Sequence, residues 1–349
     1  MMILNPLLAF CSLGLSLVQA PQTPEPPAEL ARFLHESIQL TPDQFAAAMR
    51  GEAVVKVLDT RERRDIAVFG ITTVAVSRAA YVARVRDSKN WLRTPTRSSF
   101  GLFSNPATPA DVAAFTISQR DANEMKDCKP GDCVVKLPAT DMQRIHAEMN
   151  WSAPDLVVQI SAYGRRRLIE YITDYRARGD SALAIYDDKG NVHASDAFAA
   201  LLAESPYVYQ TVPSLERYLA SYPHATLADA SEVLFWSEDV LPHLRPILSV
   251  THQVVFTPPE LPGMTLIAAK QIYADHYFEA AVDLTSIVDG EGRDGRPASY
   301  LLIFRRYRFD NMPGGLLNIR GKAVGALRDQ MLADLQREKA GAEAASGRP

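Results

Sequence analysis

The sequence has few cysteines and no long apolar run beyond its first twenty residues. Only three cysteines occur in 349 residues. A helix that spans a bilayer needs about 20 consecutive apolar residues, and no later stretch reaches that length. The formal net charge of −4 offers no electrostatic basis for binding nucleic acid or an anionic membrane. We therefore expect a protein that, once its first segment is removed, is not integral to a membrane and binds no nucleic acid.

The common catalytic and cofactor motifs are also missing. There is no Walker phosphate-binding loop, no G-x-S-x-G nucleophile motif and no H-E-x-x-H zinc motif. Residues 290–295 (GEGRDG) match G-x-G-x-x-G, but they separate two expected strands and no helix start follows them. We interpret them as a hairpin loop. The sequence therefore predicts no cofactor and no metal, and it leaves the question of catalysis open.

The first twenty residues, Met1 to Ala20, are uncharged and mostly apolar. The small-residue spacing of Val18-Gln19-Ala20 suits a signal peptidase, and the Pro-rich segment 21–28 is typical of an extended leader. We interpret residues 1–20 as a signal peptide, which predicts a periplasmic or secreted protein. Because no Lys or Arg precedes the apolar core, an uncleaved anchor or a buried helix stays an alternative.

The two cysteines outside this leader lie close together in CKPGDC. Cys128 and Cys133 flank Pro130-Gly131, a dipeptide that favours a turn and would bring the two thiols together. In an oxidising compartment this pattern predicts a disulfide loop. The alternative, half of a zinc site, lacks a second pair of Cys or His nearby. A loop this short restricts the unfolded chain by roughly 2–3 kcal/mol at most.

The order of the expected elements predicts an α+β fold. Helical periodicity marks residues 28–50 and most of 139–225, whereas β-branched segments occur near residues 54–76 and alternating ones after residue 230. Short connections between the later strands require antiparallel neighbours. Two further short strands are expected at Phe115 to Ile117 and Ser181 to Tyr186.

The chain is expected to close with a long helix from Leu316 to about Arg337, after Pro313-Gly314-Gly315. We expect one domain over residues 29–338, in which residues 139–225 form a helical insertion. The polar segment 339–349 is expected to be a disordered tail.

The pattern at both ends of this domain resembles the START-like, helix-grip (SRPBCC-type) family. It rests on a strand that runs into a helix (TTVAVSRAAYV, residues 72–82) and on RFDNMPGGLL (residues 308–317), where that family passes from its last strand into its closing helix. The resemblance covers residues 52–92 and 230–337. It implies a curved antiparallel sheet that grips the closing helix, with an apolar cavity between them for a lipid, sterol or polyketide. No catalytic residue carries over, and the helical insertion departs from the family pattern.

The closing helix has an apolar stripe. Leu317, Val324, Leu327, Met331 and Leu335 share one face at spacings of three, four and seven residues. Each glycine in a helix lowers its stability by about 1 kcal/mol relative to Ala. We therefore expect another interaction to offset this loss at Gly321 and Gly325, which lie near this face. Close approach to the sheet or room for a ligand would supply it, and simple packing of helix on sheet is the alternative. We take Val324 as a candidate ligand contact.

The densest polar chemistry lies at residues 270–279 and on the strand before them. Period-two alternation places Lys270 in a row with Met264, Leu266, Ala268 and Ile272, and it places His252 in a row with Leu248, Val250, Val254 and Phe256. Each is the polar exception in an apolar row. Lys270, His252, Tyr273 and His276 are therefore candidate ligand-binding residues. The alternatives are a lysine at the sheet rim and a hydrogen-bonded core histidine.

A second row combines Tyr277, Glu279 and Asp283 on one strand, and we expect it to face solvent, with a catalytic carboxylate pair as the alternative. The leading functional hypothesis is an exported binding or carrier protein for an apolar or amphipathic, lipid-like molecule held between sheet and closing helix. A hydrolase or cyclase on the same scaffold, and a structural or assembly factor without a ligand, are the alternatives.

Overall fold

The computed structural model describes residues 25–206, 212–241, 244–292, 295–312 and 319–345. The expected signal peptide lies outside these residues, so its cleavage stays a prediction. Within the described residues, no helix is long and apolar enough to cross a membrane.

Eight antiparallel strands form the main sheet, in the order β1-β2-β10-β9-β8-β7-β6-β3. Tight turns join β8 to β9 and hairpins link the later strands, which is why neighbours along the chain pair antiparallel. The antiparallel sheet predicted from the alternating segments is thus confirmed. The strands are β1 (Val54–Leu58), β2 (Asp65–Val74), β3 (Arg97–Leu102), β6 (Ser231–Asp239), β7 (Ile247–Phe256), β8 (Met264–Ala274), β9 (Phe278–Glu291) and β10 (Pro297–Phe309).

The N-terminal helices begin at recognisable caps. Thr41 forms a capping box with Gln44 before α2 (Pro42–Met49), and the Ser77 side chain accepts from the Ala80 amide at the start of α3 (Arg78–Arg86). Helix α1 (Ala28–Arg32) continues into a π-helical turn, η1 (Phe33–Ser37), and α4 (Ser88–Trp91) follows α3.

The middle of the chain is mainly helical, as expected, but one predicted short strand is absent and another is shorter than predicted. Residues Phe115 to Ile117 have no strand structure, and of Ser181 to Tyr186 only β4 (Ile185–Tyr186) is extended. A 3-10 turn, η3 (Gly179–Ala182), occupies the start of the latter segment. The other elements are η2 (Pro109–Val112), α5 (Gln119–Met125), α6 (Ala139–Glu148), α7 (Leu156–Arg178), β5 (Val192–His193), α8 (Ala194–Ala203) and α10 (Pro213–Ser221).

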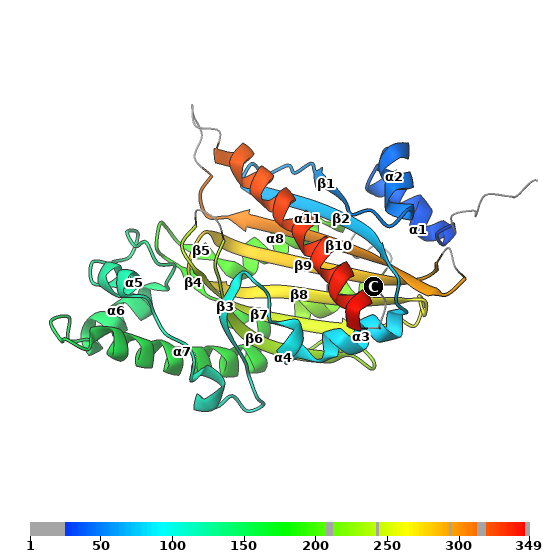
Figure 1. The fold of residues 1–349 in the computed structure, drawn as a ribbon. Coiled ribbons are helices and arrows are strands. Elements are labelled where there is room, and N and C mark those ends of the chain that lie inside the picture. The colour runs from blue at the N-terminus through cyan, green and yellow to red at the C-terminus, as the bar shows by residue number, and fades with distance from the viewer. Residues whose placement is uncertain (1–24, 207–211, 242–243, 293–294, 313–318, 346–349) are drawn as a thin grey trace, which may run out of the picture.

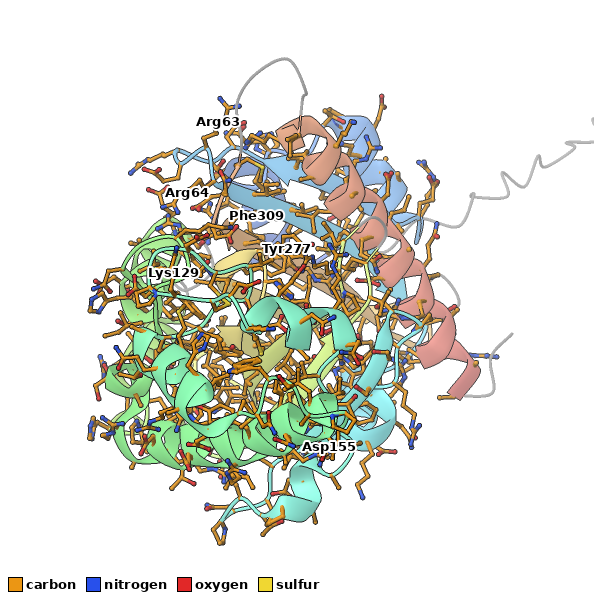
Figure 2. The ribbon with its side chains drawn as sticks, turned by 90° about the vertical axis from the view of Figure 1, so that its left-hand side faces the viewer. Arg63, Arg64, Lys129, Asp155, Tyr277 and Phe309 are labelled. Carbon is orange, nitrogen blue, oxygen red and sulfur yellow. A yellow bond between two sulfur atoms is a disulfide. The ribbon has the colours of Figure 1, made fainter. Side chains whose placement is uncertain are left out.

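Helices cover both faces of the sheet, as Figures 1 and 2 show from two directions. Helix α11 (Ile319–Ala345) crosses one face and packs there with α3. Helices α7, α8 and α10 pack on the opposite face, and so do α1 and α2. The sheet is therefore buried on both sides, so apolar residues on both faces contribute to the core.

Helix α11 bears out the helix-grip arrangement that the sequence predicts, but its length differs. Met331 and Leu335 of the expected stripe are fully buried against the sheet, whereas Val324 and Leu327 are only partly buried. Leu317 lies outside the described residues. The helix runs on to Ala345 and buries Ala342, so the prediction of a disordered tail from residue 339 is wrong for residues 339–345.

Candidate binding site beneath the C-terminal helix

A cavity of about 260 Å³ lies between the sheet and α11. Its floor comes from strands β6 to β10, its roof from the middle of α11 around Leu327 and Gln330, and one side from the segment at Trp91. No residue of α11 before Met331 is buried, so this half of the helix is loosely packed. The sheet and α11 therefore leave an unfilled space between them.

Five polar side chains line the centre of this cavity, and we call them the polar floor: Ser249, Thr251, Gln253, Gln271 and Thr285. In the described part of the chain, none of their hydroxyl or amide groups makes a hydrogen bond to another residue, and none is among the fully buried polar atoms that lack a partner, so water or a ligand can reach them. Gln253 and Ser249 are only 5% and 7% exposed. Thr251, Gln271 and Thr285 are partly exposed, so the polar floor is open to hydrogen bonds with water or with a bound molecule.

Strand register gathers the polar floor at one place. Thr251 of β7 lies opposite Gln271 of β8, and Gln253 lies opposite Ala269. The register shifts between Val250 and Thr251, which is a local irregularity in this pairing. Ala269 and Ala281, both among the lining residues, have side chains too short to fill the space above them. Small residues beside polar ones create both the volume and its hydrogen-bonding capacity.

A chain of ion pairs forms one wall of the cavity. Arg305 of β10 bonds Asp283 at 3.0 Å and Asp334 of α11 at 2.5 Å, and Arg337 bonds Asp334 at 2.7 Å. Burial raises the pKa of the Asp283 carboxyl, although Arg305 opposes the rise. Burial alone would raise the pKa of Asp334 too, but Arg305 and Arg337 hold it below its usual range. The prediction that the row containing Asp283 faces solvent is wrong for Glu279, which is buried and pairs with Arg64, whereas the Asp283 side chain is 35% exposed and lines this cavity.

The structure places His252 and Lys270 on the opposite face of the sheet, away from α11. They lie opposite one another on β7 and β8. The Lys270 ammonium donates to Asp180 Oδ1 at 2.5 Å and to the Leu219 carbonyl at 2.7 Å, and it lies over the Phe198 ring. The expectation that Lys270 faces the closing helix is therefore wrong, because helices from the insertion cover its face of the sheet.

His252 is held in the same way. Its Nδ1 lies 3.0 Å from the Tyr175 hydroxyl, and its Nε2 lies 3.1 Å from the Tyr218 hydroxyl and 3.3 Å from Glu232. Burial lowers the pKa of the imidazole, although Glu232 opposes this shift. Both ring nitrogens thus have internal partners, which is the arrangement of a core histidine.

Lys270→Met is accordingly expected to lower the free energy of unfolding by about 2 kcal/mol, because the Leu219 carbonyl and Asp180 lose their partner. Urea unfolding measures the change, and Lys322→Met, at an exposed position of α11, is the control. An unchanged or higher stability for the Lys270 variant would contradict this structural role.

The remaining predicted residues also fall outside this cavity. Tyr273 lines a different cavity, under the helical insertion, and His276 lies in the turn after β8 that borders it. Val324 packs against the core beneath α11 but does not line the cavity there. The predicted disulfide is confirmed, since Cys128 and Cys133 are bonded in the loop after α5.

The sequence contained a signal for the polar floor that its interpretation missed. Ser249, Thr251 and Gln253 alternate with the apolar row that contains His252. Alternation tells which residues share a face but not which helix covers that face. The rows of His252 and Lys270, which were predicted to contact a ligand, pack against the helices of the insertion instead.

Comparison with known proteins adds little to this geometry. No family model matches the chain, and no curated protein matches it. Among solved structures, the crystal structure of the Zhui aromatase/cyclase from Streptomyces sp. R1128 is similar, with a TM-score of 0.23 and 11% sequence identity over 39% of this chain and 84% of that one. At that TM-score no role of the cyclase is carried over to this chain.

Proposed function

We propose that the protein binds a small, neutral polar molecule, rich in hydroxyl or amide groups, between its sheet and α11. The observation that carries this proposal is the polar floor, whose hydroxyl and amide groups line the cavity and make no hydrogen bond to another described residue. Glutamine and threonine side chains each offer donors and acceptors. A ligand that itself carries both would satisfy them together.

The chemistry of the cavity selects against the apolar ligand that the family resemblance implies. A hydrocarbon chain laid on the polar floor would leave its hydroxyl and amide groups unpaired, at about 1–3 kcal/mol each. The charged groups at the wall are already paired with each other. The volume of about 260 Å³ lies just below the usual range for ligand pockets, which begins at about 300 Å³. A compound of monosaccharide or cyclitol size fits these conditions.

Ligand-observed NMR against a mixture of monosaccharides, cyclitols and small amides tests the proposal. We expect saturation transfer to at least one neutral polyhydroxyl compound and none to a fatty acid of similar mass. Competition between the compounds then shows whether they share one site. Transfer to the fatty acid alone would contradict the proposal.

We also propose that the protein is exported, which the apolar leader and the Cys128–Cys133 disulfide support. Intact mass of protein from its own cells is expected to fit a chain that starts near Pro21 and carries no free thiol. Reduction and alkylation should then add two labels. A mass that includes residues 1–20, or thiols that react before reduction, would contradict export or the oxidised loop respectively.

A further inference from the structure

A second and larger cavity, of about 440 Å³, lies on the other face of the sheet, and we call it the insertion chamber. Helices α5, α6 and α7 and the segment before β4 form one side, and the ends of β6, β7 and β8 form the other. Five aromatic rings stand among the aliphatic side chains of its apolar wall: Phe115, Tyr163, Tyr171, Trp236 and Tyr273. Ile185, at its rim, is 43% exposed although it is apolar. Apolar surface thus extends from the rim into the chamber.

The ionisable groups that line the insertion chamber are almost all acidic. Six are carboxylates and one, Arg167, is a cation. Arg167 pairs with Asp141 at 2.8 Å and with Glu170, so it is not available to an acidic ligand. An anionic molecule that entered would therefore meet repulsion, whereas a cation would be attracted both by the carboxylates and by the aromatic ring faces.

Asp275 is the carboxylate best placed to meet such a cation. It sits in the turn after β8, where its Oδ1 accepts the Leu248 amide at 2.9 Å. Its Oδ2 lies 4.0 Å from His276 Nε2, beyond hydrogen-bond distance. The side chain is 16% exposed and lines the chamber. The backbone of Asp275 is fixed, because its carbonyl accepts the Lys136 amide at 2.7 Å.

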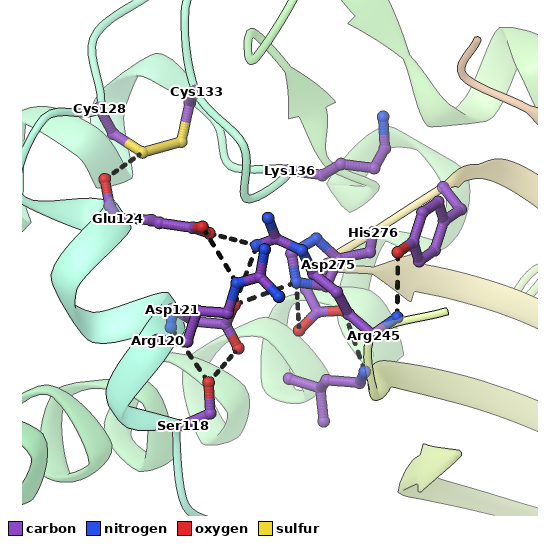
Figure 3. Close-up of polar contacts among 12 residues, drawn as sticks. Ser118, Arg120, Asp121, Glu124, Cys128, Cys133, Lys136, Arg245, Asp275 and His276 are labelled. Atoms are coloured by element: carbon purple, nitrogen blue, oxygen red, sulfur yellow. Dashed lines mark hydrogen bonds and ion pairs between the residues drawn. A yellow bond between two sulfur atoms is a disulfide. The ribbon is translucent and has the colours of Figure 1, made fainter. Parts of the chain in front are cut away.

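The charges around Asp275 are visible in Figure 3, and its ion-pair partner, the His276 imidazole, is shared with Asp121 and lies closer to it. Arg245, from the segment before β7, bonds Glu124 and lies 3.6 Å from Asp121, both on α5. His276 lies 3.4 Å from Asp121. Burial raises the pKa of Asp275 to about 7, with His276 opposing the shift and Asp121 adding to it. A largely buried carboxylate that shares a distant histidine with a second carboxylate gains from a cationic ligand.

We propose that the insertion chamber binds a small amphipathic amine, whose apolar or aromatic body packs on the ring wall and whose ammonium group meets Asp275. This site is separate from the cavity beneath α11, and it does not depend on the function proposed there. The two differ in ligand class: neutral and polar beneath α11, cationic and amphipathic in the chamber.

Three probes of nearly equal size separate the charge from the apolar body: phenethylamine, phenethyl alcohol and phenylacetate. Isothermal titration at pH 8 is expected to show phenethylamine binding at least about tenfold more tightly than the alcohol, with phenylacetate the weakest. Asp275→Asn should remove the preference for the amine and leave the alcohol unchanged. Asp132→Asn, in the exposed disulfide loop, controls for net charge and should change nothing.

The pH dependence supplies a second readout. Below a pH of about 7, Asp275 holds a proton that an ammonium ligand must displace, so the affinity for phenethylamine is expected to rise between pH 6 and pH 8. In Asp275→Asn the rise in affinity with pH should flatten. Any pH dependence that remains is assigned to His276, because Asp121 and Asp275 raise the pKa of its imidazole against the effect of burial.

Two results would overturn the proposal. One is equal binding of the three probes, which would make the chamber an apolar site without charge selection, and the other is no saturable binding of the amine. Loss of folding is not expected in Asp275→Asn, because the substitution removes an unfavourable buried charge. The melting temperature of this variant at pH 8 should be no lower than that of wild type. Thr251→Val, in the other cavity, should leave amine binding unchanged.

Discussion

Replacing the polar floor with apolar side chains of similar size is expected to abolish ligand binding beneath α11 without loss of stability. In Thr251→Val combined with Gln253→Met and Gln271→Met, three groups without partners among the described residues become apolar. Because these groups have no protein partner to lose and the apolar replacements are partly buried, the free energy of unfolding is expected to stay the same or to rise by up to about 1 kcal/mol. The same change deprives a hydroxyl-rich ligand of its partners, so its affinity should fall about a hundredfold or more.

Thr265→Val is the matched control for this experiment, because it makes the same substitution on a neighbouring strand. The Thr265 hydroxyl, unlike that of Thr251, is paired: it lies 2.8 Å from the Thr257 hydroxyl and accepts from Arg78 at 2.9 Å. This variant should lose about 1 kcal/mol of stability and keep ligand binding. A loss of stability in Thr265→Val but not in Thr251→Val, together with a loss of ligand binding in Thr251→Val alone, would support the polar floor as a ligand site. A loss of stability in both would show that the floor is structural.

Asp334→Ala is expected to cost about 3 kcal/mol of unfolding free energy. Asp334 is 5% exposed and joins α11 to the sheet through Arg305, while it also bonds Arg337 and Gln330. Its loss leaves the buried Arg305 with Asp283 alone, and breaking a buried pair typically costs 3–5 kcal/mol. Urea unfolding at pH 7 measures the change.

The matched control for this variant is Asp329→Ala, in the preceding turns of the same helix, where the carboxylate is exposed and pairs with its neighbour Arg328. It should change stability by less than about 0.5 kcal/mol. The lowered pKa of Asp334 stabilises the fold above the unfolded value near 3.9, and this contribution is lost as the pH falls through the folded value. The gap between wild type and Asp334→Ala should therefore shrink below about pH 4. A gap that does not change with pH would contradict the ion-pair account.

Local patterns in the sequence predict most of the fold. The alternating segments and the closing helix are where their periodicity places them, and the CKPGDC turn holds its disulfide. Periodicity cannot show which helix covers each face of the sheet. His252 and Lys270 were polar exceptions in apolar rows, but both faces of this sheet are apolar because helices cover both. Only the path of the insertion decides which row meets α11.

The sequence could not predict the two cavities, because each depends on how segments far apart in the chain pack together. The space beneath α11 arises where Ala269 and Ala281 lie opposite a loosely packed half-helix, and the insertion chamber arises between segments more than a hundred residues apart. The buried end of α11 was missed because its Gly- and Ala-rich composition is typical of a tail. There Arg84, not an apolar partner, packs beside Gly341.

Native mass spectrometry of the protein purified from its own cells tests the ligand site beneath α11 most directly. We expect wild type to carry a small polar molecule that dissociates on unfolding, and we expect the triple variant of the polar floor to carry none although it folds normally. The proposed function would be contradicted if both proteins retain the same adduct, or if the molecule released is a lipid.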